Sequence, residues 1–149
     1  MSERRPALVL RVPSRTEFLA AIRDVTRRMA EAAGFDGPSA DQLALAVDEA
    51  STNVIEHAYR GAGDRRIELR FDAQGGVLRV EVADDGEAVD PRAIPKVDLR
   101  RYASERRTGG LGMHLMGRIM DTVTFRRTSR GNVCCMVKRK PGAGSGATP

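Results

Sequence analysis

The 149-residue sequence has little of what several classes of protein require. It contains no Trp and only 4% aromatic residues, so base-stacking platforms for single-stranded nucleic acids are scarce. No apolar run approaches the roughly 18 residues of a membrane span, and the N-terminus MSERRPALVL lacks the apolar core of a signal peptide. We therefore expect a cytoplasmic protein that makes no direct contact with membranes or nucleic acids.

Cysteine is also scarce, and its placement excludes a disulfide framework. The two cysteines, Cys134 and Cys135, are neighbours, so on a strand they would point to opposite faces and could not easily share a metal ion or a bridge. We interpret them as reduced strand residues. The net charge of +5 is spread along the chain, which fits an acidic protein partner or a nucleotide as well as it fits nucleic acid.

The apolar pattern predicts one domain over residues 1–140 and a flexible tail over 141–149. The first two expected helices each begin at a serine in capping-box spacing: Ser14 with Glu17, and Ser39 with Gln42. Each helix has an apolar stripe at helical spacing. The stripes consist of Phe18, Ile22, Val25 and Met29 in the first helix, and Leu43, Val47, Ala50 and Val54 in the second.

Alternating apolar residues predict strands, and two Gly-containing turns join four of them into hairpins. Residues 87–108 show no periodicity, which is typical of a lid, and a largely buried helix follows at 108–121. The order is strand, helix, helix, hairpin, lid, helix, hairpin, which indicates a two-layer α/β sandwich. The expected strands lie at 7–13, 65–71, 77–84, 122–127 and 133–140.

Polar residues recur at a four-residue step in the second helix, beside its apolar stripe. Glu49 and Asn53 share one helix face, and His57 follows four residues later. A carboxylate can act as a general base, and an amide oxygen can ligate a hard cation such as Mg²⁺. The alternative is an ordinary solvated helix flank, which this pair of residues alone does not exclude.

A second polar motif ends the strand at 77–84. Asp84 could accept a hydrogen bond from an exocyclic amine such as that of adenine, and Gly86 removes a side chain that would keep a flat ligand away from the backbone. By itself an Asp-x-Gly sequence is more often only a turn.

A third motif, at Gly109, Gly110 and Gly112, opens the last predicted helix. Its free backbone N–H groups could hold phosphate, although glycine at a helix start is also common without any ligand. The motif is not a P-loop, because no Gly-Lys-Ser/Thr sequence is present.

In this order the three motifs resemble the N, G1 and G2 boxes of the GHKL ATPase superfamily, which includes gyrase, Hsp90, histidine kinases and MutL. The sequence looks most like the RsbW-type anti-sigma factor serine/threonine kinases, over about residues 8 to 139. The resemblance implies the histidine kinase-like ATPase (Bergerat) fold. In that fold we expect a mixed, mainly antiparallel sheet with helices on one face.

The resemblance also implies roles for the residues of the motifs. Glu49 would take the proton from an acceptor hydroxyl, and Asn53 would ligate Mg²⁺ at the phosphates of ATP. Asp84 would bind the adenine amino group, with Gly86 giving the base room. His57 has no catalytic assignment and is interpreted as supporting packing or the helix end. Further contacts to the nucleotide are implied for Thr108, Gly109, Gly110 and Gly112, with Arg106 and Arg107 as additional phosphate contacts.

The sequence departs from the superfamily pattern in two places. A second glycine after Gly86 is absent, as it often is in the anti-sigma branch, and Glu87 and Ala88 stand there. In the last hairpin, Asn132 and Val133 stand where the family commonly has a Thr that helps to hold adenine. This second departure bears on nucleotide affinity and not on the fold.

By this resemblance the protein is a homodimeric anti-sigma factor that sequesters a sigma factor. It would use ATP to phosphorylate a serine or threonine on a STAS-domain anti-anti-sigma antagonist, as a protein kinase in a partner switch that regulates transcription. Two alternatives stay open: an ATP-binding regulator that binds partners without kinase activity, and, from charge alone, a nucleic-acid-binding protein. Arg23, Arg27 and Arg28 would suit an acidic partner, although such a face is more often only solvated.

Overall fold

The structure of the protein, a computed structural model, describes residues 7–88 and 115–142 and contains one five-stranded sheet. The strand order is β1-β2-β3-β5-β4, and all four neighbouring pairs are antiparallel. The expectation of a mixed sheet is therefore wrong for the described strands. Two of the four pairings are hairpins, which can only be antiparallel, and the other two pair distant strands in the same antiparallel sense. The strands are β1 (Leu8–Pro13), β2 (Arg66–Gln74), β3 (Val77–Asp84), β4 (Thr122–Thr128) and β5 (Gly131–Arg139).

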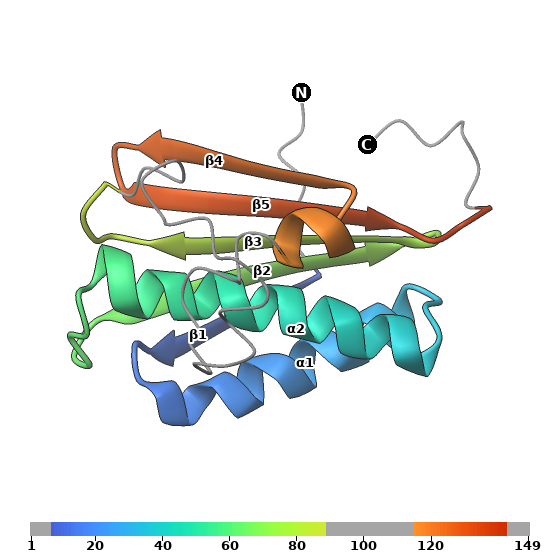
Figure 1. Ribbon diagram of the computed structural model, residues 1–149, viewed down its shortest axis with the longest axis horizontal. Helices are drawn as coiled ribbons and strands as arrows, with labels where there is room; N and C mark the ends of the chain where they lie inside the picture. The colour runs from blue at the N-terminus through green and yellow to red at the C-terminus, as the bar shows by residue number, and fades with distance from the viewer. Residues whose placement is uncertain (1–6, 89–114, 143–149) are drawn as a thin grey trace, which may run out of the picture.

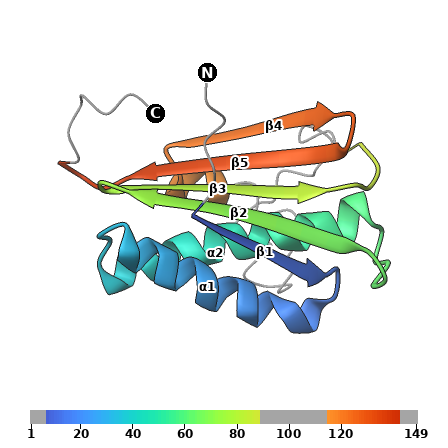
Figure 2. The same cartoon turned by 180° about the vertical axis from the view of Figure 1, so that it is seen from behind.

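The helices all lie on one face of this sheet (Figure 1). Seen from behind, the sheet stands in front of them, which confirms the predicted two-layer α/β sandwich (Figure 2). No helix in the described part of the chain is long and apolar enough to cross a membrane. The helical segments are η1 (Thr16–Phe18), α1 (Leu19–Ala32), α2 (Gly37–Asn53), η2 (Val54–Ala58) and a short helix at 115–119.

The core lies between the two layers. Alternate residues of β2 and β3 face the helices and are at most 1% exposed, as the period of two predicts. The predicted stripe of α2 is buried throughout, whereas in the first helical segment only Ile22 is fully buried and the other stripe residues pack at the edge of the core. The strand residues of the core centre are Ile67, Leu69, Phe71, Leu78, Val80 and Val82.

Ser14 does not cap a helix, contrary to the sequence prediction. Its hydroxyl donates to the Ala62 carbonyl at 2.5 Å and accepts from the Arg65 N–H at 3.2 Å, so it ties the end of β1 to the loop before β2. The first helical turn begins two residues later, at Thr16, without a side-chain cap. The hydroxyl that the local pattern assigned to a helix cap instead bonds backbone groups that are far away in the sequence.

The cap of α2 also differs from the prediction. Asp36 is the N-cap residue, and its carboxylate accepts from the Ser39 N–H at 2.8 Å. Pro38 therefore lies inside the first helical turn. Proline is tolerated there because the first turn of a helix needs no backbone donor within the helix.

Both predicted hairpins are confirmed. The first turns at Gly75 and Gly76, whose positive φ angles of 55° and 80° suit a tight two-residue hairpin turn. In the second hairpin, Cys134 belongs to the core under the helices while its neighbour Cys135 faces the opposite side of the sheet. Both thiols are free and buried, and burial raises the pKa of Cys134 to about 12.

Candidate functional site

Glu49 and Asn53 lie on the last turns of α2 and are both buried, with exposed fractions of 5% and 6%. Residues four apart on an α-helix are neighbours on one face, so the two side chains point into the same region. The alternative of a solvated flank is therefore wrong for this pair. A carboxylate and an amide held away from water need another explanation.

All the buried side-chain polar atoms that lack a hydrogen-bond partner in the described residues belong to residues 49–57. They are Glu49 Oε2, both Oδ1 and Nδ2 of Asn53, and His57 Nε2. Leaving such a group unpaired costs about 1–3 kcal/mol, and native proteins contain few of them. Their concentration on one helical stretch is typical of a surface that a polar ligand completes.

Burial also changes the acidity of Glu49. Desolvation raises its pKa to about 7, and the nearby carboxylates of Asp48 and Glu56 act in the same direction. Asp48 itself is paired with Arg23 at 3.1 Å. A carboxylate with a pKa near neutrality is partly ionised under physiological conditions and is still basic enough to accept a proton, which suits a general base.

The helix widens directly after Asn53. In η2 the Tyr59 N–H donates to the carbonyl of Val54, five residues back, at 2.9 Å, which is the bonding of a π-helix. The four-residue step that links Glu49 and Asn53 therefore does not continue with the same geometry to His57, which is 36% exposed. Turns of this kind are rare and concentrate at functional sites. The α-helical periodicity used for the sequence prediction did not indicate it.

The end of β3 packs against this widened turn. Asp84 is 8% exposed, and the Glu87 N–H donates to the Ala58 carbonyl at 3.0 Å. A Cβ on Gly86 would lie 2.5 Å from the Ala58 oxygen, so glycine is needed for the backbone contact itself. The structure thus brings Asp84 and Gly86 against the helix that carries Glu49.

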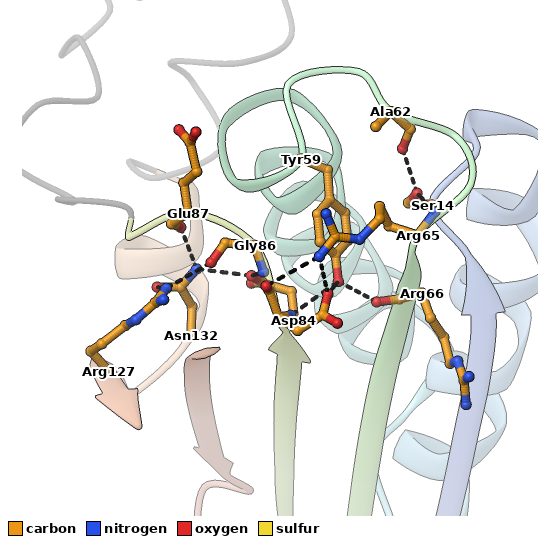
Figure 3. Close-up of polar contacts among 11 residues, drawn as sticks. Ser14, Tyr59, Ala62, Arg65, Arg66, Asp84, Gly86, Glu87, Arg127 and Asn132 are labelled. Carbon is orange, nitrogen blue, oxygen red and sulfur yellow. Dashed lines mark hydrogen bonds and ion pairs between the residues drawn. The ribbon is translucent and has the colours of Figure 1, made fainter. Parts of the chain in front are cut away.

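A hydrogen-bond network holds the same turn from the side of β2 (Figure 3). The Tyr59 hydroxyl lies beside the Arg66 carbonyl, is 2.9 Å from the Asp85 carboxylate and accepts from the Asp85 N–H at 3.1 Å. The Arg65 guanidinium stacks 5.0 Å from the Tyr59 ring centre and pairs with Asp85 at 2.8 Å. The sequence analysis missed Tyr59, although in a chain with only two tyrosines each one merits attention.

A cavity of about 150 Å³ lies between the end of α2 and the sheet. Its apolar floor includes Val82, Cys134 and Phe125, which are paired in register on β3, β5 and β4. Asn53 and Asp84 lie at its polar side. An apolar slot with a few polar groups is typical of a site for a flat heteroaromatic ligand. A larger, open hollow of about 1380 Å³ lies on the helix-free face, but neither Glu49 nor Asn53 lines it.

Comparison with known proteins agrees with this geometry. Residues 12–138 match the histidine kinase-like ATPase domain family. The chain is 31% identical over 127 residues to the serine-protein kinase RsbW of Listeria monocytogenes, covering 83% of this chain and 81% of the relative. The RsbW of Bacillus subtilis is 31% identical over 125 residues, which are 80% of this chain and 78% of that protein. The chain belongs to the RsbW family of histidine kinase-like ATPase domains.

Solved structures share the RsbW-family fold at lower sequence identity. The SiaB-SiaC complex from Pseudomonas aeruginosa superposes with a TM-score of 0.59 at 17% identity, over 90% of this chain and 89% of that one. The histidine kinase domain of the Erythrobacter litoralis EL346 blue-light activated histidine kinase gives a TM-score of 0.52 at 19% identity, over 87% and 62%. These likenesses confirm the predicted fold.

The G2-like part of the predicted site lies outside the described residues. Roles for this part of the RsbW-family chain therefore stay predictions, as do the roles of Glu49, Asn53, Asp84 and Gly86. Within 7–88 and 115–142, no group of three or more His, Cys, Asp or Glu side chains could hold a metal ion. The predicted residues outside the structure are Arg106, Arg107, Thr108, Gly109, Gly110 and Gly112.

Proposed function

We propose that this protein is an ATP-dependent serine/threonine protein kinase that also acts as an anti-sigma factor. The observation that carries the proposal is the set of unpartnered buried polar atoms on Glu49 and Asn53, beside an apolar slot closed by Asp84. Glu49 accepts the proton of the acceptor hydroxyl, because its raised pKa keeps it basic near pH 7. Asp84 accepts a hydrogen bond from the adenine amino group.

The residues present also fit Mg²⁺ with ATP. The Asn53 Oδ1 atom is a hard oxygen that is buried and has no partner among the described residues, as a ligand oxygen would need. One protein oxygen suffices, because Mg²⁺ keeps several waters and binds nucleotide phosphates directly. Bound there, the ion would supply charge neutralisation at the phosphates during in-line transfer. The amide nitrogen of Asn53 remains free to donate to a phosphate oxygen.

The proposed partners follow from membership of the RsbW family. We propose that a homodimer sequesters a sigma factor in the cytoplasm and phosphorylates a STAS-domain antagonist, which captures the kinase when unphosphorylated. The relatives named above are serine-protein kinases, which supports the phosphotransfer step. We assign this activity to a domain at 1–140, with 141–149 as a tail; the last strand, β5, ends at Arg139.

The deciding experiment is incubation with γ-labelled ATP and a STAS-domain protein from the same genome. Label on a serine or threonine of the STAS protein is expected, and it should disappear with Glu49→Gln. ATP binding without label on the protein would instead favour the regulator that only binds its partners. Absence of ATP binding would reject both interpretations.

A further inference from the structure

Three polar side chains form a row across the end of the sheet, beside the slot. Asp84 on β3 is the register partner of Asn132 on β5, and Asn132 is the register partner of Arg127 on β4. All three line the same cavity as the apolar row of Val82, Cys134 and Phe125, two residues further along the strands. Side chains in such a row are close enough to interact directly. Figure 3 shows Asn132 between Asp84 and Arg127.

The hydrogen bonds of this row fix the orientation of the Asn132 amide. Arg127 Nη1 donates to Asn132 Oδ1 at 3.1 Å and to the Gly86 carbonyl at 2.7 Å. A guanidinium can only donate, so the amide oxygen must face Arg127 and the amide nitrogen must face Asp84. Asn132 Nδ2 donates to Asp84 Oδ1 at 2.8 Å and to the Glu87 carbonyl at 2.6 Å.

These contacts hold both the Asp84 carboxylate and the turn that follows it. Oδ1 accepts from Asn132 and from the Gly86 N–H at 2.9 Å, so both of these hydrogen bonds fall on one oxygen. Oδ2 is then the oxygen left to receive a ligand. Burial raises the pKa of Asp84, whereas the bonds from Asn132 and Gly86 lower it and so favour the ionised form, which can only accept.

We infer that Asn132 and Arg127 are positioning residues that preset Asp84 for a purine with a 6-amino group and thereby set the base specificity of the site. The inference deepens the proposed function and rests on it. A 6-oxo purine presents an acceptor to the carboxylate acceptor, and a purine without a 6-substituent offers it no donor. Neither can replace the amino group, because its ring would cover Asp84 Oδ2 and exclude water without supplying a donor to that oxygen.

The same geometry explains the departure at Asn132 from the threonine that the family resemblance implies. A threonine hydroxyl has a single proton and can donate to one acceptor. The asparagine amide has two, and here they go to the Asp84 side chain and the Glu87 backbone. With asparagine at this position, Asp84 still receives a hydrogen bond, and the Glu87 carbonyl in the following turn receives another. Arg127 adds a third hydrogen bond, to the Gly86 carbonyl in the same turn.

The test compares ATP with purine riboside triphosphate, which differs from ATP only in lacking the 6-amino group. Binding of each is measured by calorimetry to the full chain with Mg²⁺. The parent should prefer ATP by about 10- to 100-fold, as expected for a hydrogen bond to a charged group. Asn132→Ala should reduce this preference to a few-fold by weakening ATP and not the analogue. Arg127→Ala should reduce it by a smaller factor.

Controls separate positioning from a general loss of structure. Arg79→Ala removes the same charge, but Arg79 pairs with Glu81 on the helix-free face, so both affinities should stay unchanged. Asn132→Thr keeps one donor for Asp84 and should restore part of the preference, which also serves if the alanine variant does not fold. In an Asp84→Asn background, Asn132→Ala should have no further effect on the preference.

Each result decides between the inference and the proposed function. If Asn132→Ala weakened the binding of ATP and of the analogue equally, Asn132 would only support the fold. If both affinities stayed at the parental values, Asn132 would not act on Asp84. Either result overturns the inference while leaving ATP binding established. A parent protein that binds neither nucleotide would overturn the proposed function itself.

Discussion

The candidate site has two halves, one on the helix and one on the sheet, and they differ in whether their buried polar groups have hydrogen-bond partners. On the helix, Glu49 and Asn53 bury polar atoms that have no partner in the described residues. On the sheet, Asp84 and Asn132 are bonded to each other and to the neighbouring backbone. Unpaired groups are costly and are tolerated where chemistry needs them, whereas a satisfied network gives a rigid recognition surface. We therefore propose catalysis for the helix half and base recognition for the sheet half.

The two halves meet through close backbone contacts, in addition to the hydrogen bonds between Tyr59 and Asp85. Gly86 lies against the Ala58 carbonyl, and the Glu87 N–H donates to that same oxygen at 3.0 Å. Gly131 makes a comparable close approach to Asp84 and Asp85 from the β4–β5 turn, with a φ of 133°. The turn after β3 thus fixes the distance between the residue that would recognise the base and the residue that would accept the proton.

The largest effect is expected from Glu49→Gln, which removes the proton acceptor and keeps the shape. The rate of phosphoryl transfer should fall by about 10²–10⁴-fold, while the dissociation constant for ATP changes by less than about threefold. Initial rates with labelled ATP and calorimetric titration measure the two quantities. Glu31→Gln is the matched control, since that exposed side chain lies on the last turn of α1 and does not act on the Glu49 pKa. If Glu49→Gln transferred the phosphoryl group at the parental rate, the proposal that the helix half carries catalysis would be wrong.

Gly86→Ala tests the junction of the two halves. The added methyl group would lie 2.5 Å from the Ala58 oxygen and 2.9 Å from Tyr59 Cδ1, so the turn or η2 must shift. We expect ATP affinity to fall at least about tenfold and stability to fall by about 1–3 kcal/mol. Urea unfolding and calorimetry measure both. Gly37→Ala, where nothing lies within 4 Å of the new atom, should change neither by much. If Gly86→Ala bound ATP with the parental affinity, the contact between Gly86 and Ala58 would not determine the geometry of the ATP site.

The pH dependence of stability should belong to the helix half. The folded protein holds the Glu49 proton more tightly than the unfolded chain, so ionising Glu49 costs folding free energy, increasingly from about pH 4.5 to about pH 7. Glu49→Gln removes this cost. The Tm of the variant minus that of the parent should therefore rise by roughly 3–8 °C between pH 5 and pH 8. A pH-independent difference would mean that the Glu49 pKa is not raised.

The smallest effect is expected where the end of the helix contacts the turn after β3, from Tyr59→Phe. The change removes the hydroxyl that bonds the Asp85 N–H and carboxylate and leaves the buried ring in place. Loss of these bonds should cost about 1–2 kcal/mol in urea unfolding, with a change in transfer rate of less than about threefold. A loss of rate as large as that of Glu49→Gln would instead place Tyr59 in the catalytic half.

Much of the fold could be predicted because it depends on local periodicity. The alternation in β2 and β3 predicts which residues face the helices, and the stripe of α2 is buried as expected. The helix caps could not be predicted in the same way. Ser14 fits a local capping pattern, yet its hydroxyl bonds Ala62, 48 residues away. A local sequence pattern contains no information about a hydrogen-bond partner that becomes a neighbour only in the folded chain.

For the site, the sequence by itself determined which residue types stand where: an acid and an amide one helical turn apart, and a carboxylate and a glycine after a strand. Only the tertiary structure decided that Glu49 is buried with a raised pKa, because burial depends on the sheet that packs against α2. Only the tertiary structure placed Asn132 beside Asp84, 48 residues away in the chain, because strand register sets that neighbour. Spacing along one element is local chemistry, whereas partners and solvent exposure are properties of the packed whole.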